Sequence, residues 1–184
     1  AGRDGLVVGE GAGTLVLEAY EHAKRRGAKI LAEIVGFGTN CDGLHVTAPS
    51  EDGMRRAMEL ALESGKVRPS DVDYVNLHGT ATEIGDIAES NATFALFGRP
   101  IPASTQKSYT GHTLGACGAI ELGYSLLMME HEFLAGNRNL DELDPRCGPL
   151  GYVRETTAAK PRLIMSNNFA FGGVNTSLIF GRGV

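Results

Sequence analysis

The stretch DVDYVNLHGTATEIGDIAESNATFALFGRPIPASTQ, residues 71–106, contains the pattern that decides the fold. Its first part, up to Gly79, is a short apolar run typical of a buried strand. Residues 83–98 have helical character and end at a glycine two residues before a proline, which is a common way to end a helix. Residues 101–106 then return to a strand-like run. A strand, a helix and a second strand in this order predict a parallel βαβ unit.

The rest of the chain continues this alternation. We predict further strands at 13–20, 29–40, 161–168 and 176–181, and helices at 18–27, 50–65 and 112–131. Ser50 is the expected N-cap of the helix that it precedes. The paired glycines in FAFGGVN, residues 169–175, suit a tight reversal between the last two strands. The expected fold class is α/β: one layered α-β-α unit with a mostly parallel five-stranded sheet that ends in an antiparallel hairpin.

Composition and charge restrict the possible functions. The chain has 184 residues, is 42% hydrophobic and carries a net charge of −5, which gives no basic face for nucleic acid or an anionic membrane. Its longest apolar run is far shorter than the roughly 20 residues of a membrane span. The three cysteines lie far apart in the sequence, so we expect reduced thiols, no metal site and a cytoplasmic location. The N-terminus has no signal-peptide pattern.

Polar side chains follow the predicted strands where ligands bind in open α/β sheets. His78 comes directly after an apolar strand, although a strand-end histidine with a purely structural role fits equally well. Glu89 lies further along the next helix, where an inward carboxylate needs a cation. Lys107 is the candidate cation, with a solvated loop lysine as the alternative. His112 precedes a long helix whose dipole disfavours a charged ring, so a neutral imidazole there could donate to a developing oxyanion.

Three segments together resemble a known family. HGTATEIGD (78–86), STQKSYTGHTLGACGAIE (104–121) and SNNFAFGGVN (166–175) closely resemble the β-ketoacyl-acyl-carrier-protein synthases. These are elongating condensing enzymes with a thiolase-like fold, and the similarity is strongest to the type I enzymes of bacterial fatty-acid synthesis. It extends over nearly the whole chain.

The resemblance implies roles for four residues. His78 and His112 would be the two histidines that bind the malonyl thioester carbonyl and assist decarboxylation. Lys107 would lie beside them, with Glu89 as its ion-pair partner. The reaction implied is a decarboxylative Claisen condensation of malonyl-acyl-carrier protein with an acyl-cysteine, without a cofactor.

The resemblance also implies a passage for the pantetheine arm that carries the substrate. Thr80 and Thr82 would line this passage, and Thr47 would reach the same arm. Phe171 would be a gating phenylalanine whose backbone N–H contributes to an oxyanion hole, with Phe169 beside it.

The family's nucleophilic cysteine has no counterpart in this sequence. We therefore expect residues 1–27 to be closing strands of an N-terminal half and a linker helix, and 28–184 to be the C-terminal thiolase-like domain. Acyl carrier protein is the expected partner, and a homodimer is expected for the complete enzyme. A polyketide ketosynthase domain and a non-catalytic carrier-binding partner resembling a chain-length factor remain as alternatives.

Overall fold

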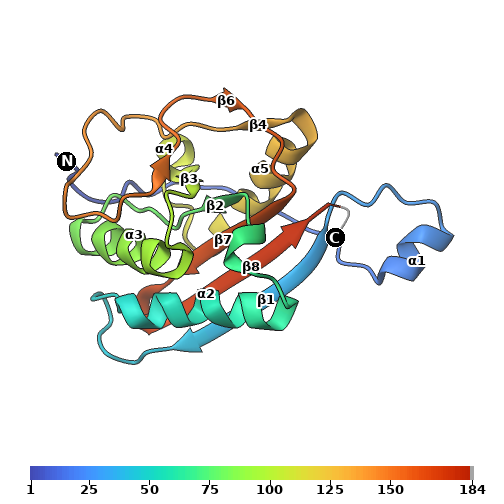
Figure 1. Ribbon diagram of the computed structural model, residues 1–184, viewed down its shortest axis with the longest axis horizontal. Coiled ribbons are helices and arrows are strands. Elements are labelled where there is room, and N and C mark those ends of the chain that lie inside the picture. The colour runs from blue at the N-terminus through green and yellow to red at the C-terminus, as the bar shows by residue number, and fades with distance from the viewer. Residues whose placement is uncertain (183–184) are drawn as a thin grey trace.

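The computed structural model describes residues 1–182, which form a six-stranded sheet with helices on both faces (Figure 1). The strands of this sheet, in the order β1-β8-β7-β2-β3-β5, are β1 (Glu33–Cys41), β8 (Val174–Gly181), β7 (Leu163–Phe169), β2 (Tyr74–Asn76), β3 (Pro102–Ser104) and β5 (Gly151–Tyr152). The helices are α1 (Tyr20–Arg25), α2 (Glu51–Gly65), α3 (Glu83–Phe97), α4 (Lys107–Thr110) and α5 (Cys117–His131). Two further short strands, β4 (Phe133–Leu134) and β6 (Thr157–Ala158), pair separately with each other.

The pairing confirms the predicted α/β class. Strands β7, β2, β3 and β5 run parallel, and β8 lies antiparallel between β7 and β1. The predicted hairpin of the last two strands is therefore present. The expected count of five strands is wrong, because the two-residue strand β5 adds a sixth at the end of a long irregular loop.

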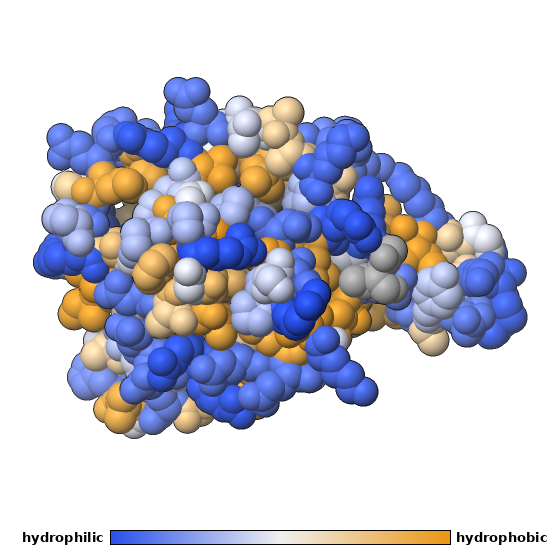
Figure 2. All heavy atoms as spheres, in the orientation of Figure 1, coloured by the Kyte–Doolittle hydropathy of each residue, from blue (hydrophilic) through white to orange (hydrophobic). Residues whose placement is uncertain are grey.

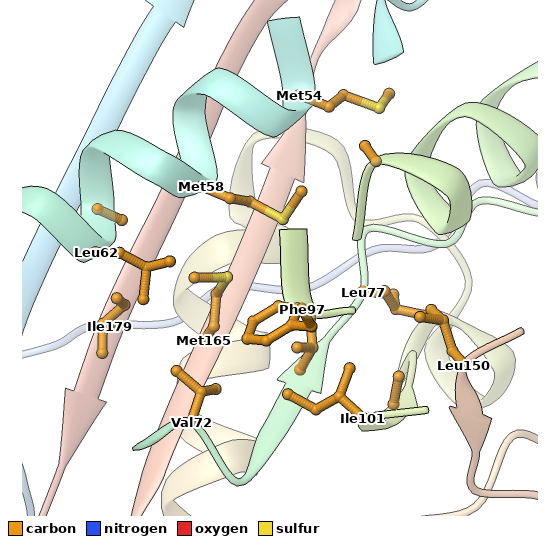
Figure 3. Close-up of a cluster of buried hydrophobic side chains, with 14 of the residues drawn as sticks. Met54, Met58, Leu62, Val72, Leu77, Phe97, Ile101, Leu150, Met165 and Ile179 are labelled. Carbon is orange, nitrogen blue, oxygen red and sulfur yellow. The ribbon is translucent and has the colours of Figure 1, made fainter. Parts of the chain in front are cut away.

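The sheet lies in the middle of three layers. Successive side chains of a strand point to opposite faces. In β2, Val75 accordingly packs with α2 and α3, whereas Tyr74 packs with α5 on the other side. Figure 3 shows the first of these clusters, in which Met58 of α2 and Phe97 of α3 meet Met165 of β7. Burial on both faces explains why β7 begins with the consecutive apolar residues Leu163–Met165.

Helix α2 follows its sequence pattern closely. The Ser50 side chain accepts a hydrogen bond from the Gly53 N–H at 3.0 Å, which confirms the predicted N-cap. Its outer face is charged and forms much of the blue lower front of Figure 2. Its inner face approaches β1 so closely that a Cβ on Gly38 would lie 2.1 Å from the Ala57 carbonyl oxygen. Only a glycine fits at that point of the strand.

The predicted strand at 13–20 is wrong. Within the described chain this segment has no partner strand, and a strand needs one to accept its backbone hydrogen bonds. The N-terminal segment instead makes one parallel bridge, between Val8 and His112. The apolar side chains of Val16 and Leu17 are largely exposed.

The predicted helix at 112–131 begins five residues later than expected. Gly111 and Leu114 both have positive φ, at 70° and 52°, which is incompatible with a continuous helix. The chain therefore forms the short helix α4, a turn and one 3-10 turn (Leu114–Ala116) before α5 starts at Cys117. His112 thus lies in a connecting turn.

Residues 1–182 contain no helix with the length and apolar character of a bilayer span.

Candidate active site

The two predicted histidines lie side by side. His78 follows β2, and His112 follows α4 and is fixed by the bridge to the N-terminal segment. The His112 N–H donates to the Val7 carbonyl at 2.7 Å. The two ring centroids are 5.2 Å apart and the ring planes are nearly perpendicular, at 87°. Phe169 of β7 lies against the His78 ring, with 6.2 Å between centroids.

Glu89 holds the backbone at His78 instead of pairing with Lys107. Its carboxylate accepts the N–H groups of His78 and Gly79 at 2.7 and 2.8 Å. The expected Glu89–Lys107 ion pair is therefore wrong, because both carboxylate oxygens are used by the loop that follows β2. Burial raises the pKa of Glu89 to about 7, and the two backbone hydrogen bonds oppose this shift.

The partner of Lys107 is Glu121. The Lys107 ammonium donates to Glu121 Oε1, and both side chains are more than 95% buried. The Asn76 amide donates to the other carboxylate oxygen at 3.3 Å. Lys107 itself begins the short helix α4 and does not end strand β3. A signal for Glu121 exists in the sequence, because it is the one charged residue in the first turns of an apolar helix and must find a cation there.

Both imidazoles are uncharged at neutral pH. Burial lowers the pKa of His78 well below its ordinary value of 6.5, and the positive charge of Lys107 acts in the same direction. Burial lowers the pKa of His112 as well, with a further contribution from Lys107. These pKa shifts agree with the neutral state that we expect for His112. Their causes are burial and the nearby Lys107, whereas the sequence suggested the dipole of a helix.

The tautomer of His112 follows from one hydrogen bond. Its Nδ1 accepts the backbone N–H of Leu114 at 3.2 Å. In the neutral ring the proton is then on Nε2, because a neutral imidazole carries one donor and one acceptor nitrogen. His112 can therefore donate through Nε2 to an oxygen atom in front of it.

A pocket of about 800 Å³ opens at the two histidines. Eight of the nine site residues singled out from the sequence line it: Thr47, His78, Thr80, Thr82, Glu89, His112, Phe169 and Phe171. Lys107 lies behind this lining. Phe171 is 63% exposed at the turn between β7 and β8, while Phe169 is buried. This turn has positive φ at both of its glycines, as the predicted reversal requires.

None of the three cysteines in the described chain has the environment of an activated nucleophile. Cys117 lines the pocket, but its thiol donates to Asn168 Oδ1 at 2.9 Å and burial raises its pKa. Reactive cysteines need a lowered pKa. Cys41 and Cys147 lie outside the pocket lining, and all three are free thiols. Among residues 1–182, no three His, Cys, Asp or Glu side chains are grouped as metal ligands.

The fold and the site together define an α/β protein whose paired, uncharged imidazoles can stabilise negative charge on an oxygen atom. Residues 31–141 match the family described as "Beta-ketoacyl synthase, C-terminal domain". The chain belongs to this β-ketoacyl synthase family.

Several relatives support this assignment. The chain is 47% identical over 180 residues to 3-oxoacyl-[acyl-carrier-protein] synthase 1 of Escherichia coli, covering 97% of this chain and 44% of that protein. Among solved structures, a β-ketoacyl synthase from Burkholderia phymatum is 56% identical, with a TM-score of 0.88, over 91% of this chain and 41% of the other. The ishigamide ketosynthase/chain length factor is 41% identical, with a TM-score of 0.94, over 98% and 45%. The chain thus spans less than half the length of these relatives.

Proposed function

We propose that this chain forms the malonyl-binding side of the active site of a 3-oxoacyl-[acyl-carrier-protein] synthase. The observation that carries the proposal is the pair of neutral imidazoles, with 5.2 Å between ring centroids, that lines a large pocket. The name of the Escherichia coli relative supports the substrate class.

The proposed reaction is a decarboxylative Claisen condensation. The malonyl thioester loses CO2, and the electrons of the broken C–C bond form an enolate. Hydrogen bonds from His78 and His112 to the thioester oxygen stabilise this enolate, because preorganised donors act strongly where water is excluded. The enolate carbon then attacks the carbonyl carbon of an acyl-cysteine, a C–C bond forms, and the cysteine leaves as a thiolate.

The acyl-cysteine of this reaction is proposed to lie outside the chain described here. Cys117, the one cysteine in the pocket lining, has a raised pKa, and the relatives are more than twice as long as this chain. We propose that an N-terminal half supplies the nucleophile and that the complete enzyme is a cytoplasmic homodimer that receives its substrates from acyl carrier protein. The pantetheine arm would enter past Thr80 and Thr82.

A second candidate is a ketosynthase of polyketide synthesis. The similarity to a ketosynthase solved in complex with a type II PKS acyl-carrier protein, at 34% identity and a TM-score of 0.84, favours this candidate. A non-catalytic role like that of a chain-length factor fits less well, because both histidines line one pocket and Lys107 is present with a buried counter-ion.

The test uses the full-length protein that contains this chain, incubated with acyl- and malonyl-acyl-carrier protein. We expect a 3-oxoacyl product two carbons longer than the acyl donor, together with one CO2 for each product. Products extended by several malonyl units without reduction would favour the polyketide candidate. The absence of both CO2 release and product would contradict the proposed function.

A further inference from the structure

The loop that carries the two pocket threonines has an unfavourable backbone conformation. Thr80 and Thr82 line the pocket, and their hydroxyl oxygens lie 3.1 Å apart. Between them, Ala81 has a φ of +61°, a left-handed conformation that is unfavourable for a residue with a Cβ. Such a conformation persists only where surrounding contacts hold it.

Two hydrogen bonds hold Ala81 from opposite sides. Its N–H donates to Asp86 Oδ1 at 3.2 Å, and its carbonyl accepts the N–H of Gly5 at 3.0 Å. The second bond comes from the N-terminal segment, which is far away in the sequence. The loop after β2 is therefore fixed partly by α3 and partly by residues before Leu6.

Arg3, on the same N-terminal segment, extends this attachment. Its guanidinium donates to the carbonyl oxygens of Thr82 at 3.4 Å and Glu83 at 3.1 Å. It also pairs with Asp86 at 3.4 Å and Asp144 at 2.9 Å, and its side chain is only 13% exposed. One side chain thus joins the end of the loop, the first turns of α3 and the loop around residue 144.

The contact geometry requires an arginine. A guanidinium carries five N–H donors in a planar fork, so it can reach two carbonyls and two carboxylates at once. A lysine retains the charge but has a single ammonium group, and cannot hold all four acceptors in these directions. The backbone of His78, by contrast, is held separately by Glu89.

We infer that Arg3 is a positioning residue that fixes the Thr80–Thr82 loop for the substrate arm, while hydrogen bonds to Glu89 and Val7 hold the backbone at the two histidines. This inference rests on the proposed function, because that proposal assigns the threonines to the arm. It predicts that loss of Arg3 weakens substrate binding far more than it slows the chemical step.

The kinetic test compares Arg3→Ala, Arg3→Lys and wild type in the full-length enzyme. We expect Arg3→Ala to raise KM for malonyl-acyl-carrier protein about tenfold with kcat within about twofold, and Arg3→Lys to recover part of the loss. Arg68→Ala is the matched control, because it removes an exposed arginine–aspartate pair that is formed within the turn before β2. An unchanged KM in Arg3→Ala, or a fall in kcat with KM unchanged, would overturn the inference.

A second measurement does not depend on activity. In amide hydrogen exchange of the full-length protein, Arg3→Ala should speed the exchange of residues 79–86 and leave α5 unchanged. Unchanged exchange in 79–86 would overturn the inference even if the enzyme condenses its substrates. If the wild type fails to condense but the exchange changes as expected, the proposed function fails and the attachment of the loop by Arg3 stands.

Discussion

At the scale of single residues, burial and hydrogen bonds decide the chemistry of the site. Sequence reasoning placed His78, His112 and Lys107 at one sheet edge, and the structure brings them together. It paired Lys107 with Glu89, whereas the structure pairs it with Glu121. Both glutamates lie on helices next to the edge, and only the three-dimensional arrangement shows that the backbone at His78 already occupies Glu89.

The Lys107–Glu121 pair should stabilise the fold. In Glu121→Gln the buried ammonium loses its counter-charge, so we expect the free energy of unfolding to fall by about 3 kcal/mol. Urea denaturation of the full-length protein measures this. The control is Glu59→Gln, which removes a partly exposed carboxylate on α2 and should change stability by less than about 1 kcal/mol. Equal stability of Glu121→Gln and wild type would contradict a buried ion pair.

Glu89 should make stability depend on pH. Its pKa is raised to about 7 in the folded protein from 4.5, so the folded state holds more protons between these values. Stability therefore falls as pH rises from about 4.5 to 7 and then levels off, a change on the order of 3 kcal/mol. His78, with its lowered pKa, has the opposite dependence, so wild type and Glu89→Gln must be compared at each pH.

The measurement is the urea midpoint from pH 5 to 8. The stability of wild type relative to Glu89→Gln should decline across this range. Glu63→Gln serves as control, because Arg56 lowers the pKa of that exposed carboxylate and no such decline is expected. A constant difference between wild type and Glu89→Gln would show that Glu89 is ionised throughout.

At the scale of helices and strands, capping residues and glycines in the sequence predict where helices begin and end. The Ser50 cap and the glycine after α3 were sufficient to locate two helices. The strand at 13–20 was wrong because pairing depends on a partner that a local pattern cannot reveal. The predicted start of α5 is too early because Leu114 has a positive φ. A positive φ is expected from sequence mainly at glycine, so a leucine gives no signal for it.

The contact between β1 and α2 offers a test at this scale. In Gly38→Ala the new methyl group would meet the α2 backbone, so we expect a loss of about 1–3 kcal/mol in stability. The matched control is Gly123→Ala in α5, where nothing lies within 4 Å and alanine favours the helix by up to about 1 kcal/mol. Thermal denaturation measures the stability of both variants. A Gly38→Ala variant as stable as wild type would contradict the close approach of α2 to β1.

At the scale of the whole molecule, several large apolar side chains are exposed to solvent. Val7, Val16 and Leu17 in the N-terminal segment, and Phe37 on edge strand β1, are half or more exposed. Val16 and Leu17 are neighbours in the sequence, and adjacent exposed apolar side chains are typical of interaction surfaces. Under the proposed function, the N-terminal half covers the segment around Val16.

The 184-residue chain alone should therefore not condense acyl and malonyl thioesters, because the proposed nucleophile is absent from it. The assay detects the 3-oxoacyl product by mass, with the full-length protein as positive control. Product formation by the short chain would show that one of its own cysteines is the nucleophile.

The central claim is that two uncharged imidazoles act on one oxygen atom of the malonyl thioester. The most direct measurement is CO2 release from malonyl-acyl-carrier protein by the full-length protein carrying His112→Ala. Removal of one oxyanion donor typically costs a factor of about 10²–10³, so we predict a decrease of that size with folding unchanged. Decarboxylation at the wild-type rate would contradict the claim.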